Sequence, residues 1–254
     1  MKELLAHREL LKTLIATDLK LEHREKWLGR VWSVVDPLLL MLVYLFIVGF
    51  VFKVREPSFP LFLFVGLLVW RFFAGSVQEA TRSLGQYASM MRQAYFPRAV
   101  IPVTVLASNS VAFGFGLVAF FILMFALGVT PKATVLWLPA LVALQALLIL
   151  GFAFLFSYLG AFFKDMTNLV SVGVRFGFYL SPVLYAVTRV PERYKAVYLA
   201  NPFASLIPAY RDVLVYGKNP EALPLLYVLG VAVVVLLVGY WLFRRHESEF
   251  VKVL

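Results

Sequence analysis

Residues 99–163 read AVIPVTVLASNSVAFGFGLVAFFILMFALGVTPKATVLWLPALVALQALLILGFAFLFSYLGAFF. This stretch holds two apolar runs, 99–127 and 133–163, and its single charged residue, Lys132, lies in the short link between them. Each run exceeds the roughly 20 residues that an α-helix needs to cross the hydrocarbon core of a bilayer. A helix also satisfies its own backbone hydrogen bonds, as a lipid-exposed segment must. The stretch therefore predicts two antiparallel transmembrane helices joined at Lys132.

Four further apolar runs extend this pattern toward both ends of the chain. Asp36 and Pro37 fit an N-cap followed by a proline in the first helical turn, so a span is expected to begin there, with Trp32 as an alternative start. The fifth apolar run, 167–187, is broken near its end by Ser181 and Pro182. The sequence thus predicts an all-α, polytopic membrane protein with six transmembrane helices. Their ranges are 37–52, 60–77, 99–127, 133–163, 167–187 and 223–243.

Three segments outside the spans complete a single transmembrane domain over residues 1–254. Residues 1–30 mix leucines at helical spacing with charges of both signs, which fits an N-terminal amphipathic interfacial helix and equally a solvated charged arm. Residues 82–98 are too polar to span the membrane and too long for a tight turn, so they are expected in the cytoplasm. Residues 188–222 are expected to form short outer re-entrant helices, at 194–199 and 204–216, in an extracytoplasmic gate region.

The composition agrees with this class and excludes others. Hydrophobic residues make up 62% of the chain and the mean hydropathy is +0.85, well above the balance of a soluble domain. The chain has no cysteine, which excludes disulfides and thiolate metal sites. Of its 24 Lys and Arg residues, 14 fall on the side of the two termini. The positive-inside rule therefore places both termini in the cytoplasm.

Sequence motifs of common enzyme classes are missing from the chain. There is no G-x-x-x-x-G-K-[ST] cradle for nucleotide phosphates, no H-E-x-x-H and no G-x-S-x-G. Nor does any nucleophile or acid–base set occur inside the apolar runs. The sequence therefore predicts a membrane protein that is not an enzyme, with no metal site, no cofactor of its own and no nucleic-acid partner.

Charged and aromatic side chains inside the spans are the candidates for a substrate channel. Because charge at bilayer depth is costly, an arginine there either lines a water-filled path or snorkels to the interface. Aromatic rings can stack on the C–H faces of sugars, and the alternative is that they only pack or face lipid. The candidate channel residues are Tyr44, Phe46, Arg71, Arg175, Phe178, Tyr179 and Tyr185.

Several short motifs, in their order along the chain, resemble the membrane-subunit family of polysaccharide and teichoic-acid ABC exporters. The most specific match is MRQAYFPR at 91–98, which is similar to the family's cytoplasmic YFPR element. FFKD at 162–165 and FYLSPVLY at 178–185 resemble the turn into helix 5 and that helix, and NPF at 201–203 resembles the outer re-entrant region. One departure lies at His23 and Arg24, where relatives often carry an Arg-Tyr pair.

The resemblance implies a homodimer of six-helix subunits in a bacterial inner membrane, in which helices 1 and 5 line the pathway. Two separate ATP-binding cassette subunits would hold ATP and Mg²⁺, and the cargo would be a polysaccharide on a polyprenyl diphosphate in the membrane lipid. Two alternatives stay open: an ABC permease for drugs or lipids, and a channel or scaffold that needs no ATPase. The implied roles are ATPase coupling for Gln86, Arg92, Tyr95, Phe96 and Arg98, diphosphate binding for Arg24, Lys26 and Arg30, and gating for Asn201, Tyr210 and Arg211.

Overall fold

The computed structural model describes residue 15 and residues 32–47, 58–93 and 96–253. Every regular element in these ranges is a helix, and four helical segments, 59–86, 100–126, 133–162 and 222–245, are long and apolar enough to cross a membrane. The all-α, polytopic class is confirmed, whereas the count of six spans stays a prediction. The elements are α3 Trp32–Leu45, α4 Phe59–Gln86, α5 Ala88–Gln93, α6 Val100–Ala126, η3 Ala133–Trp137, α7 Leu138–Phe162, α8 Met166–Leu180, η4 Val187–Arg189, α9 Glu192–Leu199, α10 Phe203–Arg211, η5 Asp212–Tyr216, α11 Ala222–Arg245 and α12 Phe250–Val253.

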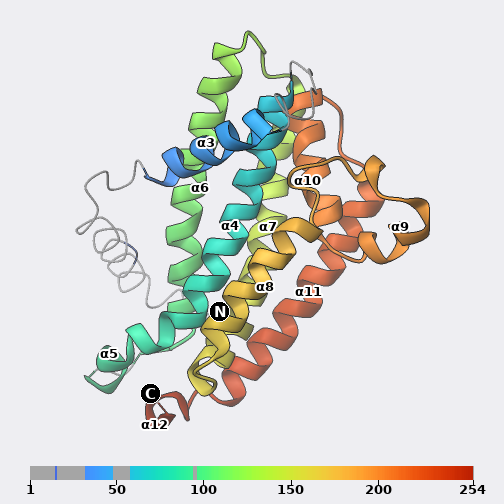
Figure 1. Ribbon diagram of the computed structural model, residues 1–254. Helices are drawn as coiled ribbons and strands as arrows, with labels where there is room; N and C mark the ends of the chain where they lie inside the picture. Colours follow the sequence, from blue (N-terminus) through green and yellow to red (C-terminus); the bar gives the residue numbers. More distant parts are fainter. Residues whose placement is uncertain (1–14, 16–31, 48–57, 94–95, 254) are drawn as a thin grey trace.

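Helix α4 forms the centre of the bundle and contacts α3, α6, α7, α8 and α10 (Figure 1). In the most apolar 18-residue stretch of α4, 78% of the residues are buried, against 22% in the corresponding stretch of α6 and 17% in that of α11. Stacked rings join α4 to α6 at Phe64 with Phe120 and at Phe72 with Phe113. The helices around α4 therefore expose their apolar side chains outward, as helices that face lipid do.

Small residues let the long helices approach each other closely. A β-carbon on Gly151 of α7 would lie 2.6 Å from the backbone nitrogen of Leu236 in α11, and one on Gly239 would collide with the Gly151 carbonyl. A β-carbon on Gly160 would likewise collide with the Thr81 carbonyl of α4. Between helices in lipid, dispersion contact at such short range supplies much of the association free energy. These glycines therefore fix α7 between α4 and α11.

The prediction that the second span ends at residue 77 is wrong, because α4 continues to Gln86. Two hydroxyls on either side of that point bond to the backbone of their own helix. Ser76 donates to the carbonyl of Phe72 and Thr81 to that of Val77, each at 2.7 Å. Ser and Thr hydroxyls that bond back to the preceding turn add no unpaired polar group, so a polar composition does not interrupt the helix.

The expected N-cap at Asp36 is also wrong, because α3 already begins at Trp32 and contains Pro37. The helix lies obliquely across α4 and α6 (Figure 1). Its 14 residues correspond to roughly 21 Å, less than the roughly 30 Å of a hydrocarbon core. A complete first span over 37–52 stays a prediction, since residues 48–57 lie outside the described ranges. Apart from residue 15, the expected interfacial helix at 1–30 lies outside them too.

The other predicted helices have counterparts in the structure, although the fifth, predicted over 167–187, is shorter and is not among the segments long enough to cross a membrane. The third, fourth and sixth spans correspond to α6, to η3 with α7, and to α11. Helix α8 ends at Leu180, directly before the predicted break at Ser181. The short helices expected at 194–199 and 204–216 are α9 and α10, the latter continued by η5.

Candidate functional site

Helix α8 carries several of the predicted channel residues and packs against α4 and α7. Its Phe178 faces inward, where the ring centroid lies 6.2 Å from that of Tyr44 in α3. Arg175 is exposed, and so are Phe176 and Tyr179, at 65% and 59%. These three residues, hereafter the α8 face, lie at i, i+1 and i+4 on one side of the helix. They form an aromatic and basic surface that the isolated subunit leaves uncovered.

Two further channel candidates lie on or beside α3. Phe46 is 62% exposed at the end of this segment. Arg71 of α4 donates a hydrogen bond to Asp36 at 2.9 Å, and the two side chains are 40% and 41% exposed. This pairing was not predicted, because Asp36 directly before Pro37 also fits a helix cap. The sequence does contain a sign of the pairing: an acid at the edge of one apolar run and an arginine inside the next. A charge at this depth requires a partner, so the two could have been paired from the sequence.

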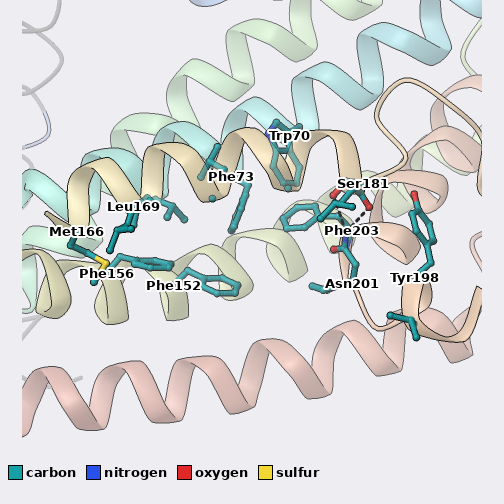
Figure 2. Close-up of a pocket in the computed structure, with 18 of the residues that line it drawn as sticks. Trp70, Phe73, Phe152, Phe156, Met166, Leu169, Ser181, Tyr198, Asn201 and Phe203 are labelled. Carbon is teal, nitrogen blue, oxygen red and sulfur yellow. Dashed lines mark hydrogen bonds between the residues drawn. The ribbon is translucent and has the colours of Figure 1, made fainter. Parts of the chain in front are cut away.

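Asn201, predicted to belong to the gate, connects the end of α8 to the start of α10. Its amide nitrogen donates to Ser181 Oγ at 2.9 Å and to the Leu180 carbonyl at 3.3 Å. Its amide oxygen accepts from the backbone nitrogen of Phe203 at 3.0 Å, at the first residue of α10. The close-up in Figure 2 shows Asn201 and Ser181 side by side at the edge of a cavity.

Arg211, the second predicted gate residue, is only 2% exposed and binds three backbone carbonyls. It donates to Phe62 in α4 at 3.1 Å, to Val183 at 2.7 Å and to Tyr185 at 3.4 Å. Its guanidinium also lies 3.3 Å from the ring centroid of Phe62, a cation–π contact. Gly66 makes room for this arrangement, because a β-carbon there would lie 2.6 Å from the Val183 carbonyl oxygen.

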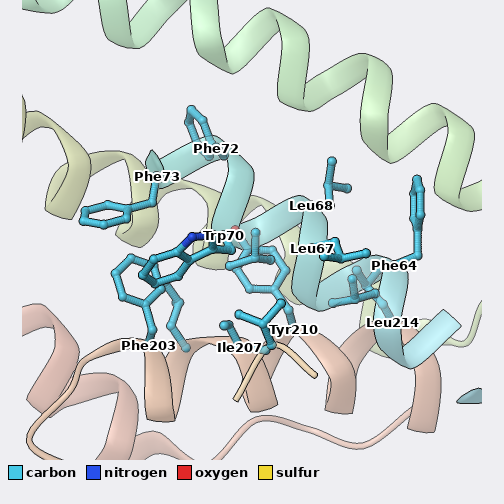
Figure 3. Close-up of a cluster of buried hydrophobic side chains, with 14 of the residues drawn as sticks. Phe64, Leu67, Leu68, Trp70, Phe72, Phe73, Phe203, Ile207, Tyr210 and Leu214 are labelled. Atoms are coloured by element: carbon cyan, nitrogen blue, oxygen red, sulfur yellow. The ribbon is translucent and has the colours of Figure 1, made fainter. Parts of the chain in front are cut away.

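Tyr210, the third predicted gate residue, is fully buried where α10 packs on α4 (Figure 3). Its ring meets Phe113 of α6 edge-on with centroids 6.3 Å apart, and its hydroxyl has no hydrogen-bond partner within the described residues. In this conformation Asn201, Tyr210 and Arg211 hold α10 in place. Their role in gating stays a prediction.

Tyr185, a channel candidate, lies half-buried in the loop after α8 rather than on the α8 face. Its hydroxyl donates to the Tyr179 carbonyl at 3.0 Å and accepts from the Tyr198 hydroxyl at 3.3 Å. Burial, and then the hydrogen bond to Tyr185, raise the pKa of the Tyr198 hydroxyl above its ordinary value. The two hydroxyls therefore link α9 to the end of α8.

At the opposite end of the bundle, Phe96 is 7% exposed within a cluster that also contains Leu84, Met91, Phe243 and Phe250. Its ring therefore packs inside the subunit itself, and its predicted role in ATPase coupling stays a prediction. The cluster joins the end of α4, helix α5 and the C-terminal helix α12, which pack together here.

Glu247 reinforces this attachment, and the sequence analysis gave it no role. Its Oε1 accepts a hydrogen bond from the backbone nitrogen of Arg98 at 2.9 Å, and its Oε2 pairs with Arg244. Gln86 and Arg92 lie on the exposed surface beside the cluster. Tyr95, Arg24, Lys26 and Arg30 lie outside the described residues.

Comparison with known proteins assigns this architecture to a family. Residues 9–215 match the family model described as ABC-2 type transporter. The chain belongs to the ABC-2 type transporter family. It is a multi-pass membrane protein, as the sequence predicted.

Three relatives of this ABC-2 type chain are similar over most of their length. An O-antigen export system permease protein RfbA of Klebsiella pneumoniae is 33% identical over 248 residues, which cover 97% of this chain and 95% of that protein. The protein of the same name in Myxococcus xanthus is 30% identical over 99% and 97% of the two chains. The polysialic acid transport protein KpsM of Escherichia coli is 25% identical over 87% of each. The predicted resemblance to polysaccharide exporter permeases is confirmed.

Proposed function

We propose that this chain is the membrane subunit of an ABC exporter that moves a lipid-linked, O-antigen-like polysaccharide across a bacterial inner membrane. The observation that carries the proposal is similarity over 97% of the chain to a permease named for O-antigen export. The match therefore extends over nearly the whole length of both chains. The subunit works as a homodimer, with both termini in the cytoplasm.

The α8 face supports a pathway between two copies of the chain. Arg175, Phe176 and Tyr179 are exposed together with Phe46 in the isolated subunit. A neutral sugar chain can slide over aromatic faces without a tight site, because each stacking contact is weak and not directional. In the homodimer, the faces of both subunits line this pathway. Outer residues 188–222 gate its exit, and Arg24, Lys26 and Arg30 hold the diphosphate at its cytoplasmic end.

Two separate ATP-binding cassette subunits supply the energy, and they dock beside the Phe96 cluster. Gln86 and Arg92 are exposed polar groups there, while Arg98 is half-buried and held through its backbone by Glu247. A buried Phe96 supports this docking site indirectly, because it fixes the surface that carries the contact residues. The partner would bind ATP and Mg²⁺, and this chain would need no cofactor.

The test is ATP hydrolysis by the full-length chain, reconstituted in vesicles with its companion ATPase. A polyprenyl-diphosphate glycan is expected to stimulate hydrolysis, whereas polyprenyl diphosphate without sugars and hydrophobic drugs are not. Stimulation by drugs alone would favour the rival permease for drugs or lipids. Glycan export in the absence of any ATPase would favour a channel.

Two pairs of variants test the assigned surfaces. Gln86→Ala combined with Arg92→Ala is expected to lower glycan-stimulated hydrolysis, while Thr130→Ala, at an exposed polar residue between α6 and α7 at the other end of the bundle, leaves it unchanged. Tyr179→Ala is expected to slow export per subunit, while Phe125→Ala, on the exposed side of α6, does not. Equal effects within a pair would refute the corresponding assignment.

A further inference from the structure

A cavity of about 720 Å³ runs along α8, between this helix and α4, α7 and α9 (Figure 2). Its walls include Trp70 and Phe73 of α4 and Phe152 and Phe156 of α7. It begins at Met166 and ends past Leu180, so it follows the 15 residues of α8, roughly 22 Å. The feature is therefore a long slot rather than a compact pocket.

The slot is open along the side of α8. Its lining residues Leu169 and Leu180 are 62% and 64% exposed, and Gly173 between them has nothing within 4 Å of the position of a β-carbon. No described residue of α11 lines it. Yet the slot reaches the side chain of Trp70, which is only 7% exposed. Hydrocarbon outside the protein thus has a path to the central helix.

The polarity of the slot is asymmetric. Along α8 its walls are apolar, and polar groups gather only at the α9 end, at Ser181, Tyr198 and Asn201. The Ser181 hydroxyl accepts from Asn201 and keeps a proton that it can donate. Behind this end lies the buried guanidinium of Arg211, which forms no ion pair with a carboxylate of the described chain. A buried, uncompensated cation attracts an anionic group to this end.

We propose that the slot binds one acyl chain of a membrane phospholipid, with the phosphate at Ser181 and Asn201. The apolar walls fit a hydrocarbon chain, and the length of roughly 22 Å exceeds the roughly 15 Å half-thickness of a bilayer core. A phosphate accepts the Ser181 proton and lies in the field of Arg211. The inference goes beyond the proposed export function, because it holds whatever cargo the protein carries.

The slot suits a slender chain better than a helix of a second copy. Helices α7 and α8 contact each other, and packed helices have axes about 8–10 Å apart. A third helix of about 10–12 Å diameter cannot enter between them to reach Trp70. A single hydrocarbon chain can.

Quenching of Trp70 fluorescence by bromine on the lipid acyl chain tests this proposal. The full-length chain keeps Trp70 and carries Phe at the other tryptophans, Trp27, Trp32, Trp137 and Trp241. It is reconstituted in vesicles of phosphatidylcholine that contain brominated phosphatidylglycerol. Trp70 is expected to be quenched despite its burial, and more strongly than by brominated phosphatidylcholine at the same mole fraction, because only phosphatidylglycerol has a net negative charge.

The variant Gly173→Leu is expected to abolish this quenching, because the new side chain fills open space in the slot. The matched control is Gly230→Leu, at an exposed glycine of α11 with equally open surroundings, and it should leave quenching unchanged. Absence of quenching in the unsubstituted slot, as expected if a second copy covers it, would overturn the proposal. So would quenching that survives Gly173→Leu. If polyprenyl phosphate relieves quenching more than unbrominated phosphatidylglycerol does, the occupant is an isoprenoid and the phospholipid assignment fails.

Discussion

Replacing Gly66 with alanine is expected to destabilise the protein, although alanine ordinarily favours a helix over glycine by about 1 kcal/mol. The new β-carbon would lie 2.6 Å from the Val183 carbonyl oxygen and 2.7 Å from Nη2 of Arg211. Neither neighbour is a free side-chain end, because these two atoms bond each other at 2.7 Å. The loop after α8 must therefore move away from α4.

The magnitude follows from the contacts that this movement breaks. Overpacking a tight site costs about 1–3 kcal/mol. Loss of the hydrogen bond between the Arg211 guanidinium and Val183 costs about 1.5–3 kcal/mol, because one partner is charged. After the gain in helix propensity, the free energy of unfolding should fall by about 1.5–5 kcal/mol. The measurement is reversible unfolding of the purified protein in mixed micelles with increasing denaturing detergent.

The matched control is Gly114→Ala in α6, where a β-carbon meets nothing within 4 Å. This change should leave the unfolding free energy equal or slightly higher. If Gly66→Ala proves as stable as Gly114→Ala, the loop is not held against α4 by Arg211, and the account of the outer end is wrong.

Three further predictions concern the inner end and the α3–α4 pair. Glu247→Ala should loosen the ATPase complex in co-purification, whereas Glu247→Gln, which keeps the acceptor, should retain it; equal retention would refute the attachment. Phe96→Ala should lower the unfolding free energy by about 3–5 kcal/mol through the cavity it leaves, while Arg92→Ala should change stability little; equal stabilities would mean that Phe96 is not buried. Asp36→Asn should reduce the yield of folded subunit in the membrane by leaving Arg71 unpaired, and Asp36→Asn with Arg71→Gln should restore it; no recovery would exclude a pairing role.

Apolar runs were sufficient to predict most helices, because backbone satisfaction in lipid leaves few alternatives to a helix. The predicted helix boundaries were wrong where a polar side chain has a hydrogen-bond partner that composition does not reveal. Ser76 and Thr81 return their hydroxyls to their own helix, so α4 runs past its predicted end. Asp36 has its partner 35 residues away, a pairing that only the crossing of α3 over α4 brings about.

The candidate site was predicted only in part, because a motif indicates which residues matter but not which way they face. Phe96 and Arg98 belong to the same short element, yet one ring is buried in the subunit and the other residue is held through its backbone. Glu247, which accepts from the Arg98 backbone nitrogen, lies 149 residues further along the chain. Similarly, the burial of Arg211 requires a glycine at position 66. This requirement follows from the contact of Val183 with α4, which the sequence does not show.

The contacts at the outer and inner ends of the bundle hold some helices more firmly than others. Arg211 fixes α10 to α4 through the Phe62 carbonyl, and the Phe96 cluster joins α4, α5 and the C-terminal tail. Gly151 and Gly239 lock α7 to α11 between these ends. Helix α8 is held near its outer end, by the Asn201 bond to Leu180 and by the close approach of Gly177 to Trp70. Elsewhere it turns Arg175, Phe176 and Tyr179 away from the bundle and borders an open slot. A conformational change driven from the inner end is therefore expected to displace the inner part of α8 readily, because Val170 is the one buried residue of this helix.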